Sequence, residues 1–171
     1  ISDISSKIVN RKPSGPFTTS TLQQVSSGRL GFGASRTMQI AQKLYQGIEV
    51  EGETIGLITY MRTDGTNLSA DAIETFRKYI KNKFGDEYIP DNAASYTGKK
   101  AKNAQEAHEA IRPTKLELKA LDKKLSSDCE RLYQLIWKIT MASQMSNAIM
   151  NVQSVSIDAL TNDKSILPKS N

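Results

Sequence analysis

The sequence places its strand patterns at its two ends and its helix patterns between them. Lys7–Asn10 predicts a short extended segment, and Val152–Leu160 alternates apolar and polar side chains as a half-buried strand does. The residues between them predict helices joined by turns. If both terminal segments belong to one sheet, the compact part is an insertion carried on two strands. We therefore expect a mostly α fold with short β segments.

The first predicted helices follow from capping residues and apolar spacing. A helix over 20–29 begins after a run of Thr and Ser, and a second helix over 35–46 begins with Ser35 as its cap. The second helix carries one apolar stripe, made of Met38, Ala41, Leu44, Tyr45 and Ile48. Two helices joined by a glycine-containing turn and followed by a strand over Ile55–Tyr60 give the order of a winged-helix-like domain.

The rest of the chain predicts surface loops and further helices. The loops cover Gly47–Glu53 and Gly85–Lys102. Ser69 opens an amphipathic helix, and Asn103 opens another that runs through about Arg112. Capping boxes begin at Thr114 and Ser127, and the second of these opens a helix with an apolar face.

These patterns divide the chain into three segments. Residues 1–12 are the first strand segment, 13–124 a compact helical domain, and 125–171 a return helix followed by the second strand segment. The chain begins at Ile1 rather than at a methionine and shows no closing helix or strand at its other end. We therefore expect it to be a piece of a longer protein.

Composition excludes several kinds of site. A net charge of +5 and a pI near 9.3 weakly favour a polyanionic partner such as nucleic acid. The single cysteine, Cys129, excludes an internal disulfide and a cysteine-cluster zinc site, and the single histidine, His108, excludes two-histidine metal motifs. The sequence has neither an apolar run long enough to cross a bilayer nor a signal peptide, so we expect a soluble, cytoplasmic protein.

The densest group of reactive side chains lies at the end of the strand predicted over Ile55–Tyr60. Tyrosine there is usually structural, but Arg62 has the same strand parity, so the two side chains would project from one face about 6.6 Å apart. A phenol has a pKa near ~10, so it needs a nearby positive charge or a base to become a nucleophile. The guanidinium of Arg62 supplies a fixed charge and matches a phosphate. Asp64 continues the same parity.

A second group surrounds the single histidine. His108 and Arg112 stand four residues apart, so they would share one face of the predicted helix. The histidine lies beside carboxylates and an arginine rather than on an apolar stripe, which favours a functional role. A surface histidine with a solvated arginine is the structural alternative, and the spacing alone leaves it open.

Four segments carry ordered motifs: Pro16–Gln24, Leu30–Phe32, Ile58–Asp64 and Gln105–Pro113. In residue type, order and spacing they resemble the bacterial type IA DNA topoisomerases, and the resemblance extends from Ile8 to about Met145. It implies that the chain is the central, tyrosine-bearing part of such an enzyme, which relaxes negatively supercoiled DNA by transient single-strand cleavage and strand passage.

The resemblance also implies roles for individual residues. Tyr60 would attack single-stranded DNA and become linked to a 5′ phosphate, and Arg62 would position the scissile phosphate and stabilise the transition state. His108 would contact that phosphate, and Asp64 would orient His108.

Two further residues would bind DNA by the same resemblance, Arg112 and Thr59. One position departs from the family, which often has serine where this chain has Gly65. That departure concerns a side-chain hydroxyl contact alone.

The resemblance further implies what lies outside this sequence. Family members bind Mg²⁺ through an acidic Toprim domain, and nothing in this chain resembles it, so we expect no metal site here and no activity from the chain alone. No nucleotide cofactor is expected, because the tyrosine ester conserves the phosphodiester energy. The expected partners are single-stranded DNA, negatively supercoiled duplex DNA and the Toprim domain of the same full-length chain, with no membrane. The expected location is the cytoplasm, in association with the nucleoid.

The resemblance assigns the three segments to two domains. Residues 13–124 would form the tyrosine-bearing domain, and 1–12 and 125–171 would belong to a β-arch that acts as a hinge. Two other functions stay open. A non-catalytic winged-helix DNA-binding module would read DNA with the helices over 20–29 and 35–46. A protein-interaction insert would fit the composition but would give Tyr60 no role.

Overall fold

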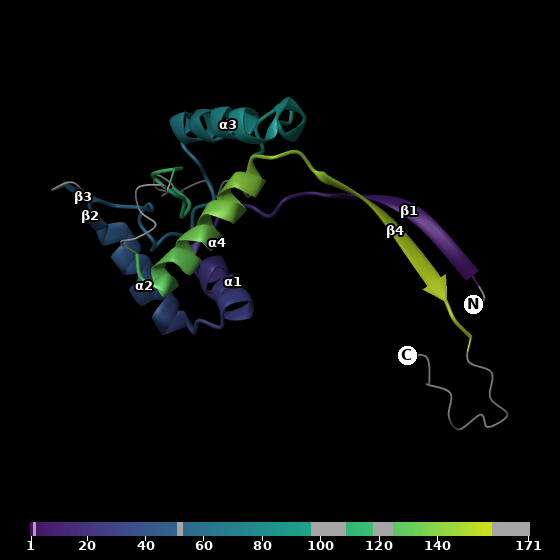
Figure 1. The fold of residues 1–171 in the computed structure, drawn as a ribbon, viewed down its shortest axis with the longest axis horizontal. Coiled ribbons are helices and arrows are strands. Elements are labelled where there is room, and N and C mark those ends of the chain that lie inside the picture. Colours follow the sequence, from purple (N-terminus) through teal and green to yellow (C-terminus); the bar gives the residue numbers. More distant parts are fainter. Residues whose placement is uncertain (2, 51–52, 97–108, 118–124, 159–171) are drawn as a thin grey trace, which may run out of the picture. The chain divides into compact units, whose positions relative to one another are not determined.

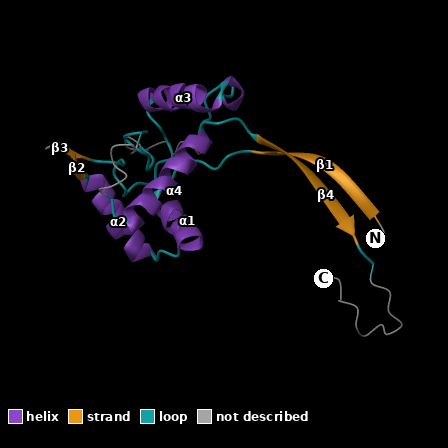
Figure 2. Ribbon diagram, viewed as in Figure 1, coloured by secondary structure: helices purple, strands orange, loops and turns teal. Residues whose placement is uncertain are grey.

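The structure is a computed structural model that describes the chain except for residues 2, 51–52, 97–108, 118–124 and 159–171. The described part holds four α-helices: α1 (Thr19–Leu30), α2 (Ala34–Gln46), α3 (Ala70–Phe84) and α4 (Ser127–Ser143). Its strands pair into two antiparallel two-stranded sheets: β1 (Asp3–Arg11) with β4 (Ala148–Ser156), and β2 (Ile48–Val50) with β3 (Glu53–Ile55) (Figures 1 and 2). The fold is therefore a mixture of helices and small antiparallel sheets.

The two terminal strand patterns pair with each other. The register of β1 and β4 runs from Asp3 opposite Ser156 to Arg11 opposite Ala148. Apolar side chains on this pair are largely exposed, among them Ile8 (78%) and Ile149 (75%). Residues 1–12 and 147–171 form one compact unit of the chain, and residues 13–146 form the other. The body is thus an insertion between two paired strands, as the sequence predicts.

The core of the second unit centres on α4. The N-terminal three-quarters of α4 packs with α1 and α2 in one apolar cluster, which includes Leu22, Leu44, Leu132, Tyr133 and Ile136. Near its end, Met141 packs in a second cluster with α3, where Ala72, Phe76 and Ile80 recur every fourth residue on one helix face. Because both clusters need α4, the return helix belongs to the compact unit, although the sequence grouped it with the terminal strand.

The predicted helices over 20–29 and 35–46 and those opening near Ser69 and Ser127 are confirmed, with corrections at two caps. Ser69 caps α3 by accepting a hydrogen bond from the Ala72 N–H. The residue that caps α2 is Gly33 rather than Ser35. For α4 it is Ser126 rather than Ser127, since the Ser126 hydroxyl accepts from the Cys129 N–H. Each corrected boundary lies within two residues of the predicted one, as is usual for helix ends.

One predicted capping box and one predicted helix fail where the structure describes them. The capping box at Thr114 opens no helix, because the Thr114 N–H and hydroxyl donate to the carbonyls of Leu57 and Gly56. The predicted helix that begins at Asn103 is only partly described, because residues 103–108 lie outside the described part of the chain. Its remaining part, Glu109–Arg112, is extended, because the N–H groups of Ala110 and Ile111 donate to Asn67 and Phe17 rather than along a helix.

The predicted loops are also more structured than expected. Residues of the loop predicted over Gly47–Glu53 contribute to the β2–β3 hairpin, and the loop predicted from Gly85 contains a 3₁₀ turn over Asp86–Tyr88. Residues 97–102 of that second loop lie outside the described part. Among the described helices, none combines the length and the apolar character needed to cross a membrane.

Candidate functional site

The segment that carries Tyr60 is not the regular strand that the sequence predicts, because the chain bends at Thr59 and at Met61. Ile55 ends β3, and Ile58 makes one isolated antiparallel bridge with Pro113. In a regular antiparallel ladder, the flanking pairs Leu57–Thr114 and Thr59–Arg112 would each exchange two backbone hydrogen bonds, but here each pair makes one. The other N–H of each pair donates elsewhere: Leu57 N–H donates to Leu44 O at 2.8 Å, and Arg112 N–H donates to the Thr59 hydroxyl at 3.0 Å. The winged-helix arrangement, which relied on this strand, is not confirmed.

Thr59 fixes the chain immediately before Tyr60. Its N–H donates to Arg112 O at 3.0 Å, and its hydroxyl donates to Ala110 O at 2.7 Å. The same hydroxyl accepts from the Arg112 N–H. The Thr59 hydroxyl thus accepts the hydrogen bond from the Arg112 N–H that the Thr59 carbonyl would accept in a regular strand pair. These bonds hold the backbone before Tyr60 against the segment over 110–113.

Thr19, the first residue of α1, fixes the chain after Tyr60. Its hydroxyl donates to Met61 O at 2.7 Å and accepts from the Thr63 N–H at 2.9 Å, while its N–H donates to Thr63 O at 2.8 Å. Met61 and Thr63 are buried, at 1% and 7% exposed. Arg62, between them, is exposed.

Exposure alternates along this segment as in a strand. Tyr60 (47% exposed), Arg62 and Asp64 are exposed, whereas Met61 and Thr63 are buried. All three side chains are therefore open to solvent, although the chain bends at Thr59 and at Met61 and is not a regular strand.

A shallow hollow of about 520 Å³ lies beside this segment. Its lining comes from the segment and from the start of α1: Thr18, Thr19, Ser20, Arg62, Thr63 and Asp64. The N–H groups of Thr19 and Thr21 at the start of α1 are already bonded within the chain, to Thr63 O and to the Thr18 hydroxyl, so the Arg62 guanidinium is the cation of the lining. The hollow therefore offers hydroxyls and one positive charge, balanced by the Asp64 carboxylate.

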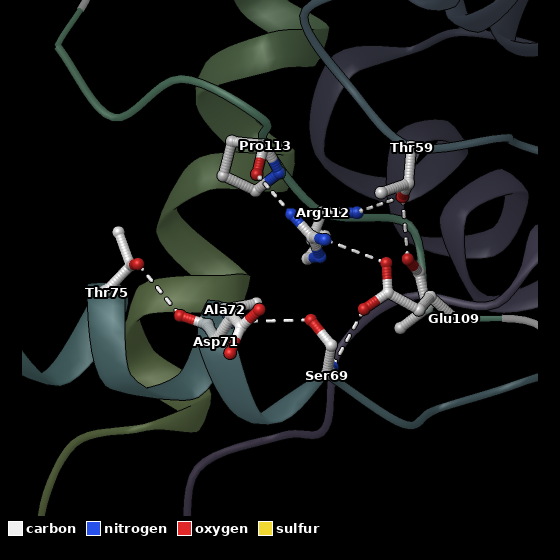
Figure 3. Close-up of polar contacts among 9 residues, drawn as sticks. Thr59, Ser69, Asp71, Ala72, Thr75, Glu109, Arg112 and Pro113 are labelled. Carbon is white, nitrogen blue, oxygen red and sulfur yellow. Dashed lines mark hydrogen bonds and ion pairs between the residues drawn. The ribbon is translucent and has the colours of Figure 1, made fainter.

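Glu109 and Arg112 form a half-buried ion pair behind this segment (Figure 3). Arg112 Nη2 donates to Glu109 Oε2 at 2.8 Å, and Nη1 donates to Pro113 O at 3.3 Å. The other oxygen, Oε1, accepts from the Ser69 N–H at 2.8 Å, at the N-terminus of α3. One carboxylate thus joins the start of α3 to the segment that holds Thr59.

The pKa of Glu109 reflects these contacts. Partial burial alone would raise it, but the hydrogen bonds from Ser69 and Arg112 and the charge of Arg112 together lower it below the ordinary value of 4.5. A carboxyl whose folded-state pKa is depressed stabilises the fold at neutral pH, and that contribution is lost as pH falls through the folded-state pKa.

Replacing Glu109→Gln should therefore destabilise the chain by about 1 kcal/mol at pH 7, because a charge-assisted hydrogen bond is lost. Glutamine does not titrate, so the difference in unfolding free energy between the two proteins should shrink as pH falls below 4.5 and through the lowered pKa of Glu109. Urea unfolding at several pH values measures it. The matched control is Glu74→Gln, which removes an exposed i,i+4 pair with Lys78 and should change nothing measurable. A difference that stays constant with pH would contradict the assigned ion pair.

The structure places some of the predicted site residues and leaves others outside the described part of the chain. Tyr60, Arg62 and Asp64 are all exposed, and Arg62 and Asp64 line the same hollow. His108 lies outside the described residues, so its contact with Asp64 stays a prediction. Arg112 and Thr59 make the intramolecular contacts given above, and their binding of DNA likewise stays a prediction.

Three residues of the site were not singled out from the sequence. Thr19 was one of several capping candidates, and its contact with the segment after Tyr60 joins residues more than forty positions apart. Glu109 had one usable signal, its i,i+3 spacing from Arg112. Tyr45 was assigned to the apolar stripe of α2, but it is 41% exposed and its ring lies against that of Tyr60.

Among the described residues, no three His, Cys, Asp or Glu side chains are grouped so that they could hold a metal ion. This part of the chain therefore does not fit a metal cofactor.

Comparisons with known proteins agree on one family. The DNA topoisomerase family model matches residues 1–169. DNA topoisomerase 1 of Rickettsia felis is 50% identical over 173 residues, covering 100% of this chain, and DNA topoisomerase 1 of Campylobacter jejuni is 51% identical over 157 residues, covering 91%. The structure of topoisomerase I from Thermotoga maritima matches with a TM-score of 0.73 and 40% identity over 88% of this chain.

The chain belongs to the bacterial DNA topoisomerase I family, the type IA topoisomerases. It spans 22% of the length of each of the two relatives and 24% of the Thermotoga chain. The expected resemblance is thereby confirmed.

Proposed function

We propose that this chain is the nucleophile-bearing part of a type IA DNA topoisomerase that relaxes negatively supercoiled DNA, with Tyr60 as the nucleophile. The observation that carries the proposal is the exposed Tyr60 side chain, two residues before an exposed Arg62 that lines a hollow of about 520 Å³. The backbone is fixed on both sides of the tyrosine, by Thr59 and by Thr19. Such fixed geometry is what in-line attack on a phosphodiester requires.

The proposed reaction is a transesterification. The phenol oxygen of Tyr60 attacks the phosphorus of single-stranded DNA and forms a phosphotyrosine bond to the 5′ end, while the bond from phosphorus to the 3′ oxygen breaks. The phenol loses a proton and the 3′ oxygen gains one. One phosphodiester replaces another, so resealing by the reverse reaction needs no nucleotide cofactor.

Charged neighbours would support this reaction. The Arg62 guanidinium would hold the scissile phosphate and stabilise the negative charge of the transition state. His108 would contact the same phosphate, with Asp64 orienting it. Arg112 and Thr59, which fix the segment before Tyr60, would contact the DNA strand near it.

The remaining parts of the proposed enzyme lie in a longer chain. Its Toprim domain would bind Mg²⁺ and face this site. A second strand would pass through the break in the cleaved strand before the break is resealed. Within this chain, the strand segments at 1–12 and in 125–171 would belong to the β-arch hinge, and 13–124 to the winged-helix-like moving domain. The proposed location is the cytoplasm, on the nucleoid.

The test is adduct formation by a full-length protein that contains this chain and the Toprim domain. It is incubated with Mg²⁺ and single-stranded DNA labelled at the 3′ end, and the reaction is stopped with denaturant. We expect labelled protein, because the downstream fragment stays on the tyrosine, and peptide mass spectrometry should place the nucleotide on Tyr60. Sequence-selective duplex binding with no adduct would instead support the DNA-binding module, and an adduct on another tyrosine would overturn the assignment of Tyr60.

A further inference from the structure

The ring of Tyr60 lies against a second tyrosine ring. The Tyr45 and Tyr60 ring centroids are 5.3 Å apart and their planes make an angle of 66°, an edge-to-face contact. Aromatic rings prefer this arrangement because the positive edge of one meets the negative face of the other. Both side chains are partly exposed, Tyr45 at 41% and Tyr60 at 47%, so the pair lies at the surface rather than in the core.

The backbone of Tyr45 is held in place by the last turn of α2. Leu44, its neighbour, is 1% exposed, and the Leu44 carbonyl accepts the Leu57 N–H at 2.8 Å. The backbone at Gly56 lies so close to the end of α2 that a Cβ added to Gly56 would lie 2.7 Å from the Tyr45 carbonyl oxygen. The end of α2 and the segment leading to Tyr60 are therefore joined directly.

The backbone of Tyr60 is equally restricted, by Thr59 on one side and by Met61 and Thr63 on the other. The freedom left to the phenol is rotation about its own side-chain torsions. A rotation about χ1 moves the phenol oxygen by several ångströms, so backbone hydrogen bonds alone do not fix its position. The Tyr45 ring blocks one range of those rotations.

We propose that Tyr45 is a positioning residue that holds the Tyr60 phenol in the orientation for attack on the DNA phosphate. This inference rests on the proposed function of Tyr60. The ring of Tyr45, rather than its hydroxyl, makes the contact, so phenylalanine replaces it and a small side chain does not. Tyr45 acts through Tyr60 and lowers the cost of reaching the reactive geometry without adding to DNA affinity.

The experiment uses full-length protein with three substitutions: Tyr45→Ala, Tyr45→Phe and Tyr88→Ala. Tyr88 is a matched control, because it is similarly exposed (45%) and its ring contacts Phe84 rather than the site. Single-turnover adduct formation is measured at saturating 3′-labelled single-stranded DNA, and DNA binding is measured separately by fluorescence anisotropy without Mg²⁺. We expect Tyr45→Ala to slow adduct formation by about 10- to 100-fold with DNA affinity within about twofold of wild type. Tyr45→Phe and Tyr88→Ala should both react at close to the wild-type rate.

Three results would overturn the proposal. If Tyr45→Ala weakened DNA binding and left the saturated rate unchanged, Tyr45 would be a stacking platform for a base instead. If Tyr45→Phe were as slow as Tyr45→Ala, the hydroxyl would be the active group. If Tyr45→Ala reacted at the wild-type rate, the contact would have no positioning role. Should Tyr45→Ala fold poorly by circular dichroism, Tyr45→Leu removes the ring and its edge-to-face contact with a smaller loss of packing, and it should also form the adduct more slowly than Tyr45→Phe. Absence of any adduct from wild-type protein would count against the function proposed for Tyr60, which separates the two failures.

Discussion

Tyr60→Phe is expected to abolish covalent adduct formation and DNA relaxation, with a loss of at least about 10⁴-fold. Removal of a nucleophile eliminates the covalent pathway rather than slowing it, and losses of this size or larger follow such substitutions. The change removes one oxygen atom and keeps the ring, so the edge-to-face contact with Tyr45 is retained. Because the side chain is 47% exposed, the unfolding free energy should change by less than about 0.5 kcal/mol. The measurements are gel relaxation of negatively supercoiled plasmid and 3′-label transfer to full-length protein.

The control for this result is Arg62→Ala, which leaves the nucleophile in place. Loss of one group that stabilises transition-state charge costs about 10²- to 10³-fold. This variant should therefore form the adduct slowly, whereas Tyr60→Phe should form none in the same time course. Adduct formation by Tyr60→Phe at a measurable fraction of the wild-type rate would show that another residue is the nucleophile. Equal and complete loss in both variants, with both proteins folded, would show that the arginine is more than a supporting charge.

The helices were largely predictable from the sequence because their signals are local. Capping residues and apolar residues every third or fourth position give both bounds of α1 and α2, and the starts of α3 and α4, within two residues. The pairing of β1 with β4 was anticipated from an extended segment near the start of the chain and an alternating one near its end. These patterns depend on neighbours within one or two turns, so a single sequence contains them.

The geometry of the site was less predictable because distant residues determine it. The Leu57–Thr59 segment has the apolar, β-branched composition of a strand, yet its hydrogen bonds go to Leu44 and to Arg112. The Glu109–Arg112 segment has helix-compatible residues, yet Ile111 pairs with Phe17, far away in the chain. In both segments tertiary hydrogen bonds outweigh local propensity. The motifs predicted the candidate reactive residues without these contacts, whereas the contacts of Thr19, Tyr45 and Glu109 exist only in the folded chain.

Two phenylalanines in α3 test how that helix is attached to the rest of the compact unit. Phe76 is 2% exposed and packs with Ile80 and Met141, whereas Phe84, two turns further on, is 40% exposed. The two positions share residue type and helix, so the substitutions Phe76→Ala and Phe84→Ala differ mainly in burial. Helix propensity favours alanine by less than about 1 kcal/mol at Phe76 and by less still at Phe84, the last residue of α3, so burial dominates the comparison.

Phe76→Ala should lower the unfolding free energy by about 3–5 kcal/mol, because it removes a buried ring and leaves a cavity between α3 and α4. Phe84→Ala should cost less than about 1.5 kcal/mol, because its ring is already partly hydrated. Urea unfolding followed by fluorescence of Trp137, the single tryptophan, measures both, since Trp137 packs against both apolar clusters. The loss at Phe76 should also weaken the ion pair at the site, because the Ser69 N–H that binds Glu109 stands at the start of the same helix. Equal costs at the two positions would mean that α3 is not anchored through its Ala72–Phe76–Ile80 face, and the link from that helix to Arg112 would then lose its basis.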